Sequence, residues 1–146
     1  MFNICRNKKG FTLVELMVVA VIVAILAAVL IPIMAGNRNR AFATEAVAAL
    51  GTTRNSLRVY YAEHSAFPTL ASGAVEGRVQ GINTGDLTGT FFSGPNYTIV
   101  SDGVAGTYTI TCTWNAAGNT APRAADISSI ATTTWLDQTG NFGGTR

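Results

Sequence analysis

The stretch Lys8-Lys9-Gly10-Phe11-Thr12-Leu13-Val14-Glu15 joins a basic leader to a long apolar segment. Residues 16–35 contain no charged side chain. About 20 apolar residues in a helix span a hydrocarbon core of roughly 30 Å. Arg6, Lys8 and Lys9 precede this segment, and basic flanks of this kind stay on the cytoplasmic side. The stretch therefore predicts a single-pass membrane helix, with its N-terminus in the cytoplasm and the rest of the chain, from about residue 37, on the far side.

An ordinary secretory signal peptide is the alternative interpretation of the same stretch. Its apolar region has about 7–15 residues and ends at a small-x-small cleavage site. Here the apolar run is longer, and a cut after Ala35 would put the large Ile33 at the −3 position. Residues 24–28 have better spacing for cleavage, but they lie inside the predicted span. We therefore favour the membrane helix.

The junction and the apolar run together resemble the N-terminal signal of type IV pilins and the related pseudopilins. In that family a membrane peptidase cuts after the glycine and methylates the new N-terminus, which implies a cut between Gly10 and Phe11. An acidic residue inside a membrane segment, here Glu15, is costly and normally has a partner. The resemblance implies that Glu15 pairs with the Phe11 amine of a neighbouring subunit. Such a pair would set the axial register of a filament, because an unpaired buried charge is strongly unfavourable. A carboxylate favoured by the helix dipole is the simpler reading of Glu15, and it is compatible with the first.

Removal of the leader changes the charge and the cysteine content. Three of the ten basic residues lie in the leader, so seven arginines remain against eight acidic residues. This balance gives no support for binding of bulk nucleic acid, which requires a clustered basic face. Cys5 also lies in the leader, so Cys112 would be the one remaining thiol and no internal disulfide is expected. Many pilins close a C-terminal loop with a disulfide, and this chain departs from that pattern.

The hydrophobic pattern predicts one long helix from residue 11 to about residue 61. Its first half, residues 11–36, is apolar all round, as a membrane or filament-core helix requires. Its second half, residues 37–63, is amphipathic, because the apolar residues narrow to one stripe. Pro32 removes a hydrogen bond and clashes with the preceding turn, so we expect a kink or local melting there. The stripe consists of Phe42, Ala46, Ala49, Leu50, Leu57 and Tyr60 or Tyr61.

The remaining residues predict a loop followed by a small antiparallel sheet within residues 97–146. Residues 64–96 are expected to form the loop. Within it, residues 70–96 are rich in Gly, Thr and Ser, with Leu87, Phe91 and Phe92 as anchors. Strands are expected at residues 97–100, at 107–114 and within 127–136. The fold class is therefore α+β and pilin-like, with the sheet packed on the long helix after a cleaved leader of residues 1–10. In the second strand Tyr108, Ile110, Cys112 and Trp114 should face the helix, with threonines on the other face.

Enzymatic and metal-binding chemistry find little support in the sequence. We see no phosphate-binding glycine loop, no Cys/His cluster and no nucleophile–base pair, and His64 is expected to be a solvated residue at the helix end. Major pseudopilins hold a calcium ion near their C-terminal strands, and the resemblance makes Asp126 and Asp137 the candidate ligands. Calcium takes about six to eight oxygens, so two carboxylates are better explained as solvated turn residues. No cofactor is therefore expected.

The resemblance implies a structural subunit that polymerises after leader cleavage and N-methylation. The main hypothesis is a type IV pilus for adhesion, motility or DNA uptake. The first alternative is the major pseudopilin of a type II secretion system, which forms a periplasmic pseudopilus. A monomeric membrane-anchored binding domain is the second alternative. The implied partners are the prepilin peptidase, an inner-membrane assembly platform with its cytoplasmic ATPase, and other copies of the chain. The precursor would lie in the inner membrane, and the filament either outside the cell or in the periplasm.

Overall fold

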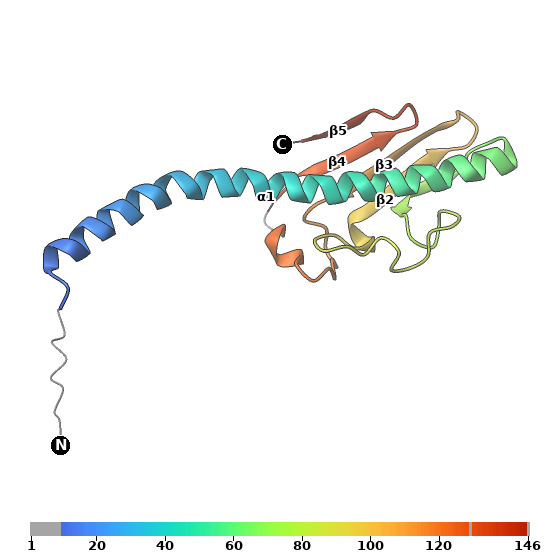
Figure 1. Cartoon of the computed structure of the whole chain (residues 1–146). Helices are drawn as coiled ribbons and strands as arrows, with labels where there is room; N and C mark the ends of the chain where they lie inside the picture. Colours follow the sequence, from blue (N-terminus) through green and yellow to red (C-terminus); the bar gives the residue numbers. More distant parts are fainter. Residues whose placement is uncertain (1–9, 129, 146) are drawn as a thin grey trace, which may run out of the picture. The chain divides into compact units, whose positions relative to one another are not determined.

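The computed structural model describes residues 10–128 and 130–145, and it divides into a unit ending at Asn39 and a unit beginning at Arg40. The leader residues Arg6, Lys8 and Lys9 lie outside the described residues. One helix, α1, belongs to both units, and the second unit also holds the five strands (Figure 1). The elements are α1 (Leu13–His64), β1 (Leu70–Ala74), η1 (Gly94–Asn96), β2 (Tyr97–Asp102), β3 (Thr107–Thr113), η2 (Ala124–Asp126), β4 (Thr133–Asp137) and β5 (Phe142–Thr145).

Local hydrogen bonds define both ends of α1. At the start, the side chains of Thr12 and Glu15 form the reciprocal bonds of a capping box. At the end, Ser65 adopts a left-handed φ of 56°, and its N–H donates to the carbonyl of Tyr61 over 2.8 Å. A left-handed residue after the last turn is a common way to satisfy a terminal helix carbonyl. The predicted long helix is thus confirmed, with its end shifted by a few residues.

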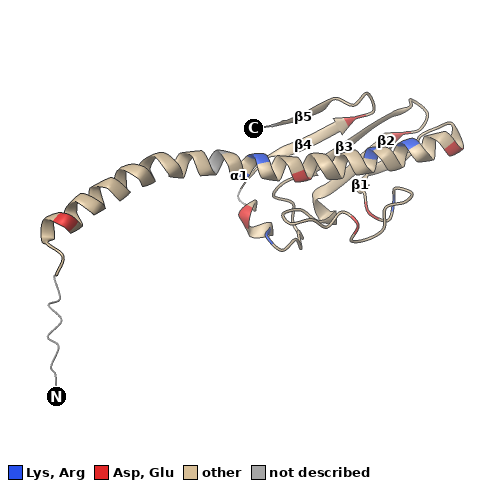
Figure 2. Cartoon of the chain, viewed as in Figure 1, with Lys and Arg blue, Asp and Glu red and all other residues tan. Residues whose placement is uncertain are grey.

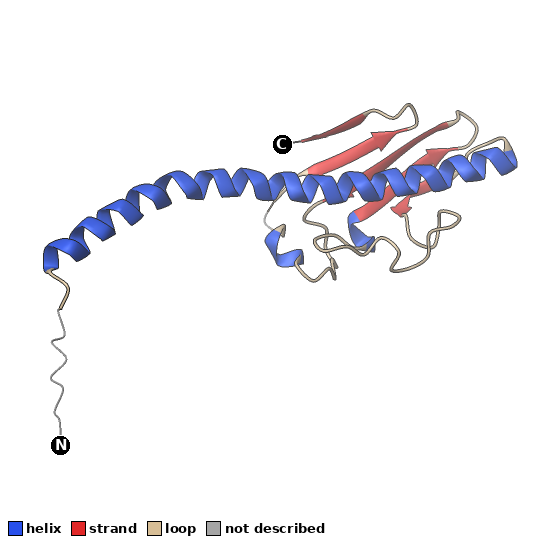
Figure 3. Ribbon diagram, in the orientation of Figure 1, coloured by secondary structure: helices blue, strands red, loops and turns tan. Residues whose placement is uncertain are grey.

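The sheet is an antiparallel meander in the order β1-β2-β3-β4-β5. Each strand pairs with the next one along the chain, and β3 is central. In the second unit α1 covers one face of this sheet (Figure 3). Along β3 the burial alternates as predicted, with Tyr108, Ile110 and Cys112 buried and the threonines between them partly exposed. The other face of the sheet is therefore the threonine-bearing one.

The core of the second unit forms where the stripe of α1 meets the sheet. Phe42, Ala46, Leu50 and Leu57 are buried, as the stripe predicted, whereas Tyr61 is 47% exposed. Thr53 lies in the same stripe and is also buried. Its hydroxyl group is satisfied there, because it donates to the carbonyl of Ala49 over 3.0 Å. Sheet residues that complete the core include Tyr97, Ile99, Ile110, Cys112, Trp114 and Leu136.

The structure adds strands that the sequence pattern did not predict. β1 lies inside residues 64–96, which we expected to be a loop, and it pairs with β2 despite its sequence Leu-Ala-Ser-Gly-Ala. β5 pairs with β4 through the sequence Phe-Gly-Gly-Thr. Alternation of large apolar and polar residues is absent from both strands, so the usual signal of a strand was missing. Both are edge strands, where one partner strand is enough to fix the backbone.

Two carboxylates hold the segment between β1 and β2 in place. Glu45 of α1 accepts hydrogen bonds from the backbone N–H groups of Thr90, Phe91 and Phe92 at 3.1, 2.8 and 2.9 Å. Glu76 accepts one from Leu87 at 3.0 Å. The expected anchors are confirmed, since Leu87 and Phe92 are buried and Phe91 packs against Phe42. The sequence did not predict these roles of the carboxylates, because a glutamate on the edge of an apolar stripe is normally solvated.

Candidate assembly segment

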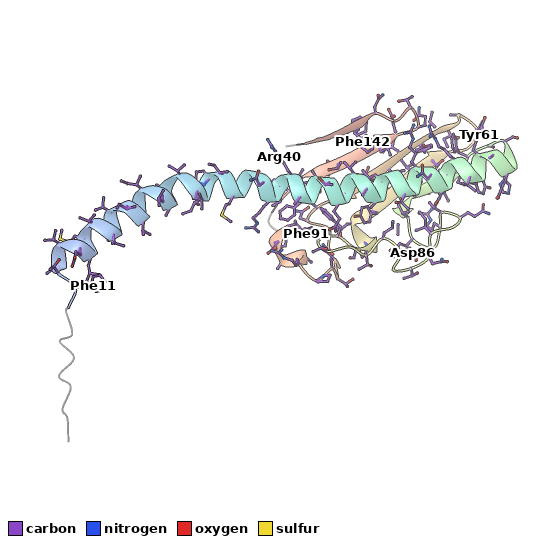
Figure 4. All side chains as sticks on the ribbon, in the orientation of Figure 1. Phe11, Arg40, Tyr61, Asp86, Phe91 and Phe142 are labelled. Atoms are coloured by element: carbon purple, nitrogen blue, oxygen red, sulfur yellow. The ribbon has the colours of Figure 1, made fainter. Side chains whose placement is uncertain are left out.

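The predicted cleavage junction lies in accessible backbone just before α1. Gly10 and Phe11 are outside any helix or strand, and Phe11 is 83% exposed (Figure 4). A Cβ added at Gly10 would meet no heavy atom within 4 Å, so the peptide bond after it is open to another molecule. A peptidase that binds an extended segment needs this kind of exposure. The geometry is compatible with cleavage at this bond, and the leader on its other side lies outside the described residues.

Glu15 is engaged within its own chain. Its Oε2 accepts hydrogen bonds from the backbone N–H and the hydroxyl of Thr12, both at 2.8 Å, and its own N–H donates to the Thr12 hydroxyl oxygen at 3.3 Å. These bonds satisfy N–H groups that the first turn of a helix otherwise leaves unpaired. Thr12 was not among the predicted site residues, although Thr-x-x-Glu before an apolar run is the sequence signature of a capping box.

The apolar half of α1 is uncovered in the isolated chain. The large apolar side chains between residues 13 and 34 are 52–73% exposed. α1 is long and apolar enough to cross a membrane, with a mean hydropathy of 3.2 over its best window. Figure 2 shows a long stretch of α1 without charged residues between two charged parts of the helix. In the sequence this stretch lies between Glu15 and Arg38. Exposed apolar area on this scale requires a hydrophobic environment, which either lipid or other apolar helices provide.

Pro32 does not interrupt α1. The helix runs without a break from Leu13 to His64, so the local melting that we expected upstream of the proline is absent from this structure. A proline removes one backbone hydrogen bond. The bonds of the turns on either side are enough to keep the backbone helical.

The two candidate calcium ligands have separate local roles. Asp126 lies in η2 and forms an ion pair with Arg123 at 2.6 Å. Asp137 ends β4, and its Oδ1 accepts bonds from the Thr139 hydroxyl and from the backbone N–H groups of Gly140 and Asn141. The Thr139 hydroxyl, with the amide groups around it, lowers the pKa of Asp137 to about 2. In residues 10–128 and 130–145, no group of three or more His, Cys, Asp or Glu side chains could hold a metal ion.

Cys112 is a buried thiol of the core. It is fully buried on β3, and burial is the main reason that its pKa rises to about 12, with the charge of Glu45 as a smaller cause. A thiol that does not ionise near neutral pH is a poor nucleophile. The interpretation of Cys112 as a small apolar core residue agrees with this environment.

Comparisons with known proteins match the N-terminal motif and identify distant relatives of the chain. Residues 5–31 match the family model described as the prokaryotic N-terminal methylation motif. The chain is 40% identical over 68 residues to the type II secretion system core protein G of Vibrio cholerae, and this alignment covers 47% of each protein. It is 38% identical over 68 residues to the protein of the same name from Aeromonas hydrophila, or 47% of this chain and 48% of the relative. It is also 44% identical over 62 residues to the type IV wide pilus major component PilA4 of Thermus thermophilus. This alignment covers 42% of this chain and 47% of the relative.

These alignments span about half the length of the curated relatives, and no solved structure matches the chain significantly. The long helix on an antiparallel sheet gives the chain a pilin-like α+β fold, and the matched motif lies at the start of this helix. The chain carries the N-terminal methylation motif and is a distant homologue of core protein G pseudopilins and of a type IV pilin.

Proposed function

We propose that the chain is the major subunit of a pseudopilus, the periplasmic filament of a type II secretion system. Core protein G of such systems accounts for most of the relatives that we found, and this similarity is the observation that carries the proposal. It favours the pseudopilus over the surface pilus that we had preferred from the sequence. The absence of a second cysteine beyond the leader is compatible with either filament.

In this proposal the precursor waits in the inner membrane with residues 11–36 across the bilayer and the second unit in the periplasm. The prepilin peptidase removes residues 1–10 after Gly10 and methylates Phe11. An assembly platform, driven by its cytoplasmic ATPase, then extracts the subunit, and the exposed apolar helices bundle in the filament core. Pro32 lies in this bundle, where its missing hydrogen bond gives the helix a point of adjustment.

Glu15 changes its partner during assembly in this account. In the single chain its carboxylate is bound by Thr12. In the filament it would pair with the Phe11 amine of the neighbouring subunit, a group that exists only after cleavage. A charge in an apolar bundle is strongly unfavourable without a partner. The ion pair can form at only one axial position of the neighbouring subunit, and it therefore fixes the register of the two subunits.

A surface pilus is the second candidate, and the similarity to the wide pilus component of Thermus thermophilus supports it. Deletion of the gene in its own host separates the two. A pseudopilin deletion abolishes secretion of exoproteins and leaves sheared surface filaments unchanged. A pilin deletion removes the surface filaments and leaves secretion intact.

Replacement of Glu15 tests whether the chain polymerises at all. Complementation with Glu15→Ala should give a processed, membrane-inserted subunit that no longer cross-links to its copies and does not restore function. Glu63→Ala is the matched control, because it removes an exposed carboxylate at the far end of the same helix. Full function of Glu15→Ala would instead point to a monomeric membrane-anchored domain.

A further inference from the structure

The sheet face that points away from α1 carries an array of threonine hydroxyl groups around one indole, with aspartates at its strand ends. We call it the threonine face. Its residues alternate along β2, β3 and β4 with the buried residues of the core. Thr98, Thr111 and Trp135 form one row across three neighbouring strands, and Thr113 and Thr133 form the next. Its hydroxyl-bearing and aromatic centre consists of Thr98, Thr109, Thr111, Thr113, Thr133 and Trp135, and the same face continues to Val100, Asp102, Thr107 and Asp137.

Trp135 lies over the backbone of β5. Its register partner there is Gly143, and a Cβ at Gly143 would collide with the indole ring. The glycine thus leaves the space in which the ring rests on the edge strand, with 37% of the residue still exposed. Within the described residues, the indole N–H of Trp135 makes no hydrogen bond. Trp114 contrasts with it, since Trp114 is buried and its N–H donates to the Thr134 hydroxyl at 3.1 Å.

The charge of the face limits the class of partner. The ionisable residues of the face are the acidic Asp102 and Asp137, which lie at strand ends where their carboxylates accept backbone N–H groups of turns. Nucleic acid requires a basic surface, and no basic residue belongs to this face. A protein partner normally buries an apolar centre. Here the neighbours of Trp135 on the face are Thr111, Thr133 and Asp137, and the one exposed aliphatic side chain, Val100, lies two strands away.

We propose that the threonine face binds a neutral polysaccharide chain. A pyranose ring presents C–H groups on its faces and hydroxyls around its edge. The faces can stack on an exposed indole, and the edge hydroxyls can bond to threonine hydroxyls, each of which both donates and accepts. Neighbouring strands are about 4.8 Å apart, so the hydroxyls of Thr98 and Thr111 and the indole of Trp135 repeat on the scale of a sugar unit. The hydroxyls of Thr98, Thr109, Thr111 and Thr113 make no hydrogen bond to other described residues.

The two tryptophans provide a direct test with an internal control. The full chain, uniformly ¹⁵N-labelled in a detergent without a sugar head group, is titrated with cellohexaose and with chitohexaose. The indole N–H signal of Trp135 should shift and saturate with at least one of them, while the signal of buried Trp114 stays in place. Single subunits are used, so the result does not depend on filament assembly.

Two variants locate the site on the face. Trp135→Ala should weaken binding about tenfold or more, because it removes the stacking surface. Tyr61→Ala is the matched control, since Tyr61 is an exposed aromatic residue of α1 off the face, and it should leave binding unchanged. An unshifted Trp114 signal in Trp135→Ala shows that the core is intact. The proposal is overturned if neither sugar shifts the Trp135 signal at about 10 mM, a concentration above any useful dissociation constant. It is also overturned if Trp135→Ala binds like the wild type, or if only an anionic polymer such as polygalacturonate binds.

Discussion

Removal of the Glu45 carboxylate should loosen the segment between β1 and β2 and lower the stability of the second unit. Its two oxygens accept three successive backbone N–H groups, those of Thr90, Phe91 and Phe92, at 2.8–3.1 Å. Gly89 comes immediately before them, and a Cβ at this glycine would lie 2.5 Å from Oε1 of Glu45. The carboxylate therefore occupies the space that the missing side chain of Gly89 leaves open. Each position should be substituted both alone and together with the other.

The magnitude follows from the number and exposure of the bonds. A hydrogen bond to a charged group contributes about 1.5–3 kcal/mol when buried. The bonds to Phe91 and Phe92 are half-buried and the bond to Thr90 is exposed, so we expect Glu45→Ala to cost about 3 kcal/mol in total. Glu45→Gln keeps one oxygen for the two half-buried N–H groups and should cost about 1 kcal/mol. For a unit of this size, 1 kcal/mol lowers Tm by roughly 4–8 °C, so Glu45→Ala should lose more than about 10 °C.

Thermal unfolding of the full chain, followed by circular dichroism, measures these changes. Glu63→Ala is the matched control, because its carboxylate is exposed and has one bond, to Gln80 at 3.2 Å. Gly89→Ala should destabilise the wild type by about 1–3 kcal/mol through overpacking, but it should be nearly neutral beside Ala at position 45. Additive effects of the two substitutions, or a Glu45→Ala variant that loses less than about 1 kcal/mol, would refute the reasoning.

Three further predictions concern the same unit. The raised pKa of Cys112 stabilises the fold below the unfolded pKa of about 8.5, and this contribution is lost as pH rises toward about 12. Cys112→Ala should therefore lose less stability between pH 8 and 11 than the wild type, as seen by urea unfolding; equal slopes would contradict this. The lowered pKa of Asp137 acts in the opposite direction, since its contribution is present above about pH 4 and is lost as pH falls through about 2. In an NMR titration Thr139→Val should raise this pKa toward its ordinary value, and an unchanged pKa would show that the hydroxyl is not the main cause. Leu50→Ala empties a fully buried position against the sheet and should cost about 2–5 kcal/mol, whereas Val59→Ala, at a position 58% exposed on the same helix, should cost far less.

Strong periodicity made part of the structure predictable. The stripe from Phe42 to Leu57 and the alternation along β3 each repeat with the period of their element, so the helix, the central strand and their contact face followed from the sequence. The junction at Gly10 and the apolar run behind it were recognisable for a different reason, because charge and hydropathy change there within a few residues.

Tertiary contacts decided the parts that sequence reasoning missed. β5 contains two consecutive glycines, which have low strand propensity, but Gly143 is needed where the indole of Trp135 covers the strand. In the sequence Glu45 looks like any polar residue beside the apolar stripe of a helix. Its role appears only in the structure, where the backbone N–H groups of residues 90–92 lie next to its carboxylate. Neither partner is close in the sequence to the residue that it explains, so no local pattern records the pairing.

The intact mass and N-terminal sequence of the protein recovered from its host test the central claim most directly. The account predicts a chain that begins at Phe11 and is heavier by one methyl group, about 14 Da, at that residue. This result would show processing by the peptidase into a subunit whose new amine can meet Glu15. A chain that still begins at Met1, or one cut near Ala28 or Ala35, would contradict the account, because no free amine would then exist next to the carboxylate at the start of α1.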